Sequence, residues 1–123
     1  MLETSPSENS VSASLSGLPS GSYRISTTWV KGTSRASNAA YTLTGVNGGP
    51  ANVLRNQQVA PDDLTWDGTA WEDLGTFQVT GGTLTVRLTD NANGYVYADA
   101  VRVEQLSPLE AVGVAEFGAG LPA

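Results

Sequence analysis

Apolar and polar positions alternate with a period of two along most of this chain, which is the pattern of half-buried β-strands. Residues 10–16 (SVSASLS) and 84–89 (LTVRLT) show it most clearly, because every second residue is apolar. Glycine, proline and asparagine gather between the alternating segments, where they favour tight turns. The pattern therefore predicts an all-β fold, an antiparallel β-sandwich of about seven strands. The predicted strands span residues 10–16, 23–30, 41–44, 52–59, 71–80, 84–89 and 95–106.

The segments that flank these strands divide the chain into three parts. Residues 1–9 are polar without periodicity and predict a flexible arm, whereas residues 10–106 form the sandwich domain. Residues 107–123 are weakly apolar, and we interpret them as a linker or as an added or donated strand. Within the domain, residues 81–82 (GG) and 90–94 (DNANG) predict the turns of β-hairpins.

The composition excludes several classes of function. The sequence contains neither His nor Cys, which removes Ser-His-Asp and Cys-His catalysis, His-based zinc sites, haem and iron–sulfur ligation, and disulfide bonds. Its formal net charge of −6 argues against nucleic acid and anionic membrane as partners. No apolar run approaches the roughly 18 residues of a transmembrane helix, so no membrane insertion is expected. An acidic chain rich in Gly, Ser, Thr and Asn and poor in Lys is typical of bacterial exported or surface proteins.

Four motifs carry a resemblance to a known family. They are QQ at residues 57–58, WEDLGTF at residues 71–77, GYVYADAVRV at residues 94–103 and GSYRISTTW at residues 21–29. Together they resemble the golvesin C-terminal and xanthan lyase carbohydrate-binding-like domain over about residues 10–106. The resemblance implies a jelly-roll-like sandwich that serves as an accessory module of large bacterial extracellular or surface proteins. Because domains of this family usually begin with one or two further strands, it also implies that the sandwich lacks its first strand or strands.

The predicted loop between the fourth and fifth strands carries the best functional candidates. Residues 60–70 hold Trp66 together with Asp62, Asp63 and Asp67. An exposed aromatic ring beside carboxylates suits a sugar, which presents flat C–H faces and hydroxyl groups. We therefore predict a polysaccharide-binding site on these four residues. The alternatives are a solvated acidic loop with Trp66 folded back as a lid, and a structural Ca²⁺ held by the aspartates; no other cofactor is expected.

The motif at residues 71–77 fits a structural role. Trp71, Leu74, Gly75 and Phe77 are interpreted as parts of the core at the head of the fifth strand. Leu74 is out of phase with Phe77, which predicts a β-bulge at Gly75.

Parity along the last predicted strand assigns its charged residues to opposite faces. Asp99 shares its parity with Val101, so its carboxylate is expected at or near the core face. A buried carboxylate must be hydrogen-bonded, and Asp99 is therefore interpreted as a structural residue that locks the strand. A ligand or metal role is the alternative. Arg102, like Arg24 and Arg87 on other strands, is expected to face outward as a solubilising charge.

Two functions remain after these exclusions. The first is a non-catalytic module that binds carbohydrate. The alternative is a structural or assembly module of a surface protein, in which the tail at residues 109–123 adds a strand to another chain. Self-association or neighbouring domains would then be the partners. Nothing places one carboxylate in an apolar pocket beside a second one, so no enzymatic activity is expected.

Overall fold

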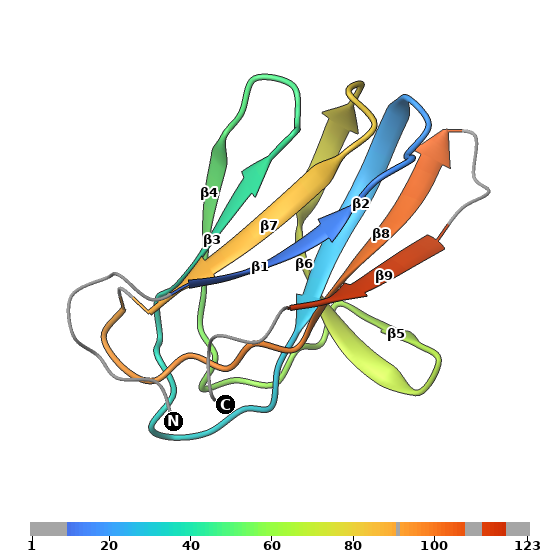
Figure 1. The fold of residues 1–123 in the computed structure, drawn as a ribbon. Helices are drawn as coiled ribbons and strands as arrows, with labels where there is room; N and C mark the ends of the chain where they lie inside the picture. The colour runs from blue at the N-terminus through green and yellow to red at the C-terminus, as the bar shows by residue number, and fades with distance from the viewer. Residues whose placement is uncertain (1–9, 91, 108–111, 118–123) are drawn as a thin grey trace.

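The alternating segments form two antiparallel β-sheets that pack face to face (Figure 1). The computed structural model describes residues 10–90, 92–107 and 112–117, and this part of the chain is all-β with nine strands. No helix that could cross a membrane occurs among these residues. The predicted antiparallel sandwich is therefore confirmed. The strands are β1 (Ser10–Leu15), β2 (Gly21–Thr28), β3 (Ala39–Thr44), β4 (Ala51–Arg55), β5 (Leu64–Trp66), β6 (Thr69–Val79), β7 (Leu84–Thr89), β8 (Ala100–Ser107) and β9 (Val112–Glu116).

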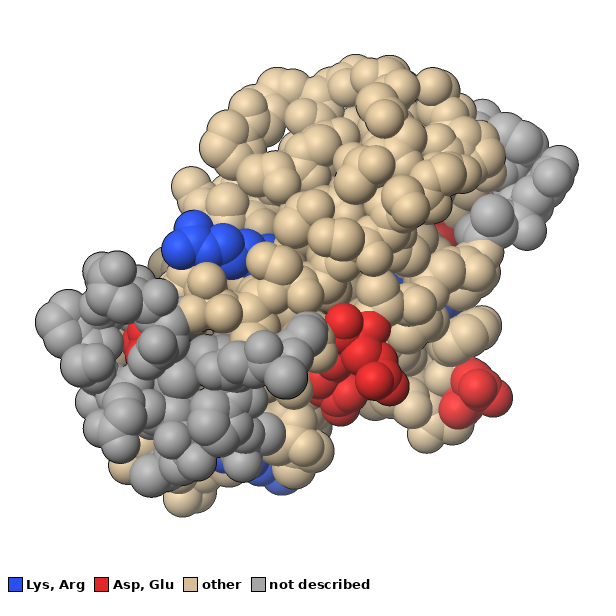
Figure 2. Space-filling model, in the orientation of Figure 1, with Lys and Arg blue, Asp and Glu red and all other residues tan. Residues whose placement is uncertain are grey.

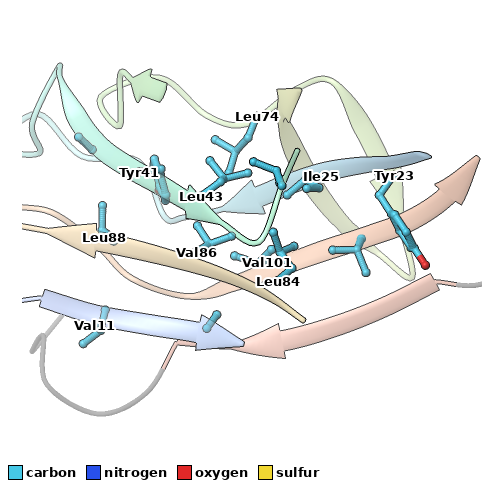
Figure 3. Close-up of a cluster of buried hydrophobic side chains, with 14 of the residues drawn as sticks. Val11, Tyr23, Ile25, Tyr41, Leu43, Leu74, Leu84, Val86, Leu88 and Val101 are labelled. Carbon is cyan, nitrogen blue, oxygen red and sulfur yellow. The ribbon is translucent and has the colours of Figure 1, made fainter. Parts of the chain in front are cut away.

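The core lies between a four-stranded sheet of order β1-β7-β3-β4 and a five-stranded sheet of order β5-β6-β2-β8-β9 (Figure 3). The apolar residues of each alternating strand face one another across this space, as in other β-sandwiches. Tyr23 and Ile25 of β2 belong to the same buried cluster as Leu84, Val86 and Leu88 of β7, and each of the five is at most 1% exposed. The period of two in the sequence thus identifies the inward face of both strands.

The connections after β6 and after β7 do not form the predicted hairpins. β6 and β7 belong to different sheets, and so do β7 and β8, so both connections cross the sandwich from one sheet to the other. The two hairpin predictions at residues 81–82 and 90–94 are therefore wrong. Alternation shows which face of a strand is buried, but strands of both sheets bury their apolar faces in the same core. It therefore does not reveal which strands pair.

A short strand lies within the segment predicted to be an irregular loop. β5 pairs with the start of β6, and Asp67 and Gly68 form the two-residue turn between them. Both turn residues have positive φ angles, 51° and 79°, which is the backbone of a type I′ turn and suits an Asp-Gly pair. The loop prediction for residues 60–70 is thus wrong in part. Trp66 ends a hairpin strand, and this position decides what its ring can contact.

β6 contains a β-bulge next to the predicted glycine. Consecutive β2 residues 25–26 pair with Gly75 and Asp73, so Leu74 is the extra residue on β6. Because of this extra residue, both Leu74 and Phe77 contact the core although three positions separate them. The bulge inferred from their mismatched phase is present.

The last strand, β9, lies in the segment interpreted as a linker or an added strand. Val112–Glu116 pair with β8 of the same chain, and β9 runs beside β1 where the edges of the two sheets meet (Figure 1). The segment therefore completes the edge of the five-stranded sheet within one molecule. Joining two chains through it would require β9 to be exchanged between them. The arm predicted at residues 1–9 lies outside the described residues.

The strand β8 begins later than the alternation predicts, and this changes the placement of two charged residues. It starts at Ala100, while residues 95–99 lie outside the ladder. The parity argument therefore does not reach Asp99, which is exposed, and its predicted place at the core face is wrong. Arg102 is the reverse case. It is on the outer face but only 4% exposed, so the expected solvated charge is wrong as well.

Candidate functional site

A cavity lies on the outer face of the five-stranded sheet, beside the β5–β6 hairpin, which projects from the sheet in Figure 1. Its volume is about 210 Å³. We call it the Trp66 cavity, because two of the predicted site residues, Trp66 and Asp67, belong to it. The residues that line it are Thr28, Trp66, Asp67, Thr69, Trp71, Asp99, Ala100 and Val114.

Paired strands hold the floor of the Trp66 cavity in place. Thr28 of β2 and Glu116 of β9 both pair with Ala100 at the start of β8. The Thr28 hydroxyl also donates a hydrogen bond of 2.8 Å to the carbonyl oxygen of Ala70 on β6. Four strands are thereby tied together under the cavity. A site built on paired strands is positioned more accurately than one built on a loop.

Trp66 rests on a buried arginine. The guanidinium carbon of Arg102 lies 5.1 Å from the centre of the indole ring, within the range of a cation–π interaction. Arg102 Nη1 in turn donates a hydrogen bond of 3.0 Å to Glu104 Oε1 on the same strand. Arg102 is buried beneath the ring, whereas Trp66 remains 37% exposed. The arginine therefore supports the ring and leaves part of it free to contact a ligand.

The wall of the cavity contains a buried donor that lacks an acceptor. Trp71 is only 4% exposed, and its indole N–H has no hydrogen-bond partner among the described residues. The Nε of Arg102 is also buried and has no hydrogen-bond partner among the described residues. An unsatisfied buried donor destabilises a folded protein by about 1–3 kcal/mol. Such groups are uncommon in native proteins, and a ligand is one explanation for them.

Asp99 lies at the rim of the cavity, just before β8. Partial desolvation of its carboxyl raises its pKa above the ordinary value, and the neighbouring charge of Glu116 on β9 raises it further. Within the described residues, neither a hydrogen bond nor an ion pair engages this carboxylate. The hydrogen bonds predicted to lock the strand through Asp99 are thus not found. Its carboxylate is instead available at the cavity.

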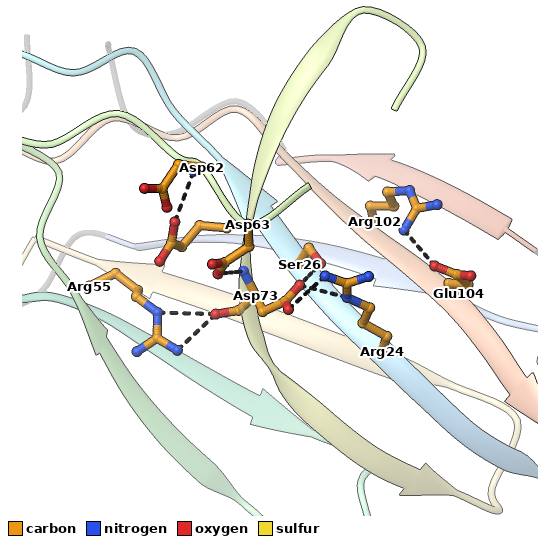
Figure 4. A network of polar contacts seen from close by, with 9 residues as sticks. Arg24, Ser26, Arg55, Asp62, Asp63, Asp73, Arg102 and Glu104 are labelled. Carbon is orange, nitrogen blue, oxygen red and sulfur yellow. Dashed lines mark hydrogen bonds and ion pairs between the residues drawn. The ribbon is translucent and has the colours of Figure 1, made fainter. Parts of the chain in front are cut away.

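A polar network beside the cavity joins β2 to β6 (Figure 4). Arg24 donates two hydrogen bonds of 2.9 Å to the carboxylate of Asp73, and Ser26 Oγ donates a third of 2.8 Å. Arg55 donates two more to the backbone carbonyl of Asp73, of 3.1 and 2.8 Å. Burial alone would raise the pKa of Asp73, but the hydrogen bonds from Arg24 and Ser26 outweigh it and hold the pKa below its ordinary value.

The Arg24–Asp73 pair predicts a pH-dependent stability. Because the pKa of Asp73 is lower in the folded than in the unfolded state, its contribution is present at neutral pH and is lost as the pH falls through the lowered value. Asp73→Asn is expected to reduce the free energy of unfolding by about 1–2 kcal/mol at pH 7 and by progressively less as the pH falls through the lowered pKa of Asp73. Urea unfolding at several pH values measures this, with Asp67→Asn at the exposed turn as control. A difference between Asp73→Asn and wild type that does not narrow on acidification would contradict the assignment.

The other two predicted site residues, Asp62 and Asp63, lie apart from Trp66. Asp62 lines a second cavity of about 230 Å³ with Trp29, Arg55, Asn56, Val59, Ala60 and Glu72. Polar groups there already bond one another: the Asp62 amide donates to Glu72 Oε1 at 3.1 Å, and the Trp29 indole donates to the Val59 carbonyl at 2.8 Å. The structure therefore divides the four predicted residues between two places, with only Trp66 and Asp67 at the Trp66 cavity.

Asp62, Asp63 and Glu72 form an acidic cluster, with one carboxylate oxygen of each within 4.8 Å of the others. Burial raises the pKa of Glu72, and the charges of Asp63 and Asp62 raise it further. Carboxylate oxygens are the ligands that Ca²⁺ prefers, although it takes six to eight of them. The structural calcium predicted for this segment would use Glu72 in place of Asp67, and calcium binding stays a prediction.

Several residues of the Trp66 cavity were missed by sequence reasoning. Thr28, Ala100 and Val114 are ordinary strand residues, and they meet only because β2, β8 and β9 are neighbours in the sheet. No local pattern signals such a meeting. The sequence predicts structural roles for Trp71 and Asp99, yet both line the cavity. The one usable signal in the sequence is the charge of Asp99, because the residues around it are uncharged. This charge is the reason why a ligand role is the alternative prediction for Asp99.

Comparison with known families identifies a matching domain family. The family described as Golvesin C-terminal domain matches residues 7–105, which include β1 to β7 and most of β8. No curated protein and no solved structure matches the chain significantly.

Proposed function

Because the chain belongs to the Golvesin C-terminal domain family, we propose that it is a carbohydrate-binding domain of a bacterial extracellular or surface protein. Domains of this family are non-catalytic accessory domains and occur in extracellular or surface proteins. The observation that carries the binding proposal is the Trp66 cavity, in which a partly exposed indole ring lies beside the free carboxylates of Asp67 and Asp99.

The chemistry of the Trp66 cavity suits a sugar ring. The exposed part of Trp66 offers an apolar surface to the C–H face of a pyranose, while carboxylates accept hydrogen bonds at its edge and threonine hydroxyls accept or donate them. A ligand oxygen inserted beside Trp71 would supply the acceptor that its indole N–H lacks. The volume of about 210 Å³ is below the roughly 300–1,000 Å³ of sites for drug-sized ligands. We therefore expect one unit of a saccharide chain to enter the cavity.

Trp66→Ala is expected to lower the affinity for a bound polysaccharide at least tenfold, because the aromatic contact is lost. The measurement is isothermal titration calorimetry, preceded by a binding screen against β-glucan, galactomannan, xylan, chitosan, polygalacturonate and alginate. Leu54→Ala is the matched control, since Leu54 is also an exposed apolar side chain but lies on β4 of the other sheet. It should leave the affinity unchanged.

Two further variants separate this site from the one first predicted. Asp62→Asn and Asp63→Asn change carboxylates outside the Trp66 cavity and are expected to keep the affinity within about twofold. An affinity that survives Trp66→Ala but is lost in these variants would move the site to the second cavity. The absence of any binder in the screen, for a domain shown to be folded, would contradict carbohydrate binding.

A further inference from the structure

On the outer face of the five-stranded sheet the basic side chains are paired with acids, whereas two acidic side chains lack a basic partner among the described residues. All six Lys and Arg residues of the sequence lie within the described part of the chain. The two on this face are both occupied: Arg24 pairs with Asp73 at 2.9 Å, and Arg102 pairs with Glu104 at 3.0 Å (Figure 4). These pairs leave no free cation beside the Trp66 cavity.

The acids at the cavity have no such partner. Asp67 and Asp99 line it, and within the described residues neither forms an ion pair. The charged group that acts on Asp99 is another acid, Glu116, which raises its pKa. In Figure 2 acidic side chains gather on the face that carries β9 and the β5–β6 hairpin. The cavity therefore lies in a region of negative potential, which attracts cations and repels anions.

The aromatic ring at the cavity also favours a cationic ligand. The face of an indole ring is negative and attracts cations. Trp66 already accepts one, because the guanidinium of Arg102 lies 5.1 Å from its ring centre. The ring is nevertheless 37% exposed, so a second cationic group can approach it from the cavity. Aromatic ring and carboxylates thus favour the same kind of ligand.

We propose that the Trp66 cavity selects saccharides that carry a free amino group, with Asp67 and Asp99 as the residues that determine this specificity. This inference rests on the proposed carbohydrate binding and goes beyond it by naming the class of sugar. The two carboxylates attract the protonated amine, and the pyranose ring contacts Trp66. A uronic acid would bring a third negative charge to the cavity, and an N-acetylated amine would bring none.

The test compares three oligosaccharides of equal length with the full chain. They are the tetramer of β-1,4-linked glucosamine, its fully N-acetylated form and tetragalacturonate, each titrated at pH 6 in low salt while the tryptophan fluorescence is followed. The amine tetramer is expected to bind at least tenfold more tightly than the N-acetylated one, and tetragalacturonate least. Raising the salt from about 50 to about 300 mM should weaken the amine tetramer several-fold. Tetralysine controls for attraction by charge alone and should bind far more weakly.

Substitutions of Asp67 and Asp99 test whether these two residues cause the preference for the amine tetramer. Asp99→Asn and Asp67→Asn should each lower the affinity for the amine tetramer about fivefold or more and narrow its advantage over the N-acetylated form. Asp62→Asn and Asp63→Asn remove the same charge outside the Trp66 cavity and should change neither quantity. Calorimetry measures these affinities independently of the tryptophan signal.

The outcomes separate this inference from the function on which it rests. Equal or tighter binding of the N-acetylated tetramer or of tetragalacturonate, still lost in Trp66→Ala, would overturn the amine preference and keep the carbohydrate site. Tetralysine binding as tightly as the amine tetramer would also overturn it. If none of the saccharides binds and the polysaccharide screen finds no ligand, the proposed function fails as well.

Discussion

Replacing Gly45 by alanine is expected to destabilise the domain by about 3 kcal/mol or more. Gly45 follows β3 with a φ angle of 90°, a left-handed conformation that strains an alanine by roughly 1–2 kcal/mol. A Cβ atom there would also lie 2.1 Å from the backbone carbonyl oxygen of Thr83, which precedes β7. Relieving such a clash requires one of the two backbones to move, and overpacking of this kind typically adds about 1–3 kcal/mol. Thermal unfolding should show a decrease in Tm of roughly 10 °C.

Gly48 in the same turn provides the matched control. Its φ angle is 78°, but nothing lies within 4 Å of the position that a Cβ atom would occupy. Gly48→Ala therefore keeps the conformational penalty and omits the clash, so a loss of only about 1 kcal/mol is expected. The difference between the two variants measures the close approach of the β3–β4 turn to the β6–β7 connection. Equal losses would contradict this approach.

The strands and the core could be predicted because alternation is a direct record of burial. Val11, Ile25, Leu43, Val86 and Val103 each lie on the apolar parity of their segment, and each is buried. The alternation of apolar and polar residues does not indicate which strands pair with each other. Alternation therefore could not show that β6 and β7, which are separated by residues 80–83, belong to different sheets.

The candidate site could be predicted only where a single segment carries it. Trp66 and Asp67 were found because an aromatic ring and a carboxylate are adjacent in the sequence. The burial of Arg102 was not predictable, because the ring that covers it comes from a hairpin more than thirty residues earlier. The prediction for Asp99 is wrong because it extends the alternation of β8 to a residue that precedes the strand. Strand pairing does not determine which way the side chain of such a residue faces. Sites assembled across several strands depend on topology, which local patterns do not contain.

The substitution Gln57→Leu is expected to destabilise the domain by about 3–5 kcal/mol. Gln57 is completely buried, and its side chain braces the segment that leads into β8. Its Nε2 donates to Tyr41 Oη at 2.9 Å and to the carbonyl of Tyr97 at 3.0 Å, while its Oε1 accepts from the Tyr97 amide at 2.8 Å. Leucine leaves these three groups without their partner, at about 1–3 kcal/mol for each group that stays unsatisfied. Chemical denaturation followed by circular dichroism measures the loss.

Substitution of the next residue, Gln58, tests whether the loss of stability is specific to the hydrogen bonds of Gln57 or follows from any substitution in this segment. Gln58 is exposed and donates one hydrogen bond of 3.0 Å to the carbonyl of Arg35, so Gln58→Leu should cost less than about 1 kcal/mol. Hydrogen exchange gives a second, local measurement: the Tyr97 amide should lose protection in Gln57→Leu before the core strands do. Because Asp99 follows Tyr97 by two residues, the same variant should also weaken ligand binding under conditions where the domain remains folded. Retained protection at Tyr97 together with retained stability would contradict the brace and, with it, this account of how Asp99 is held at the cavity.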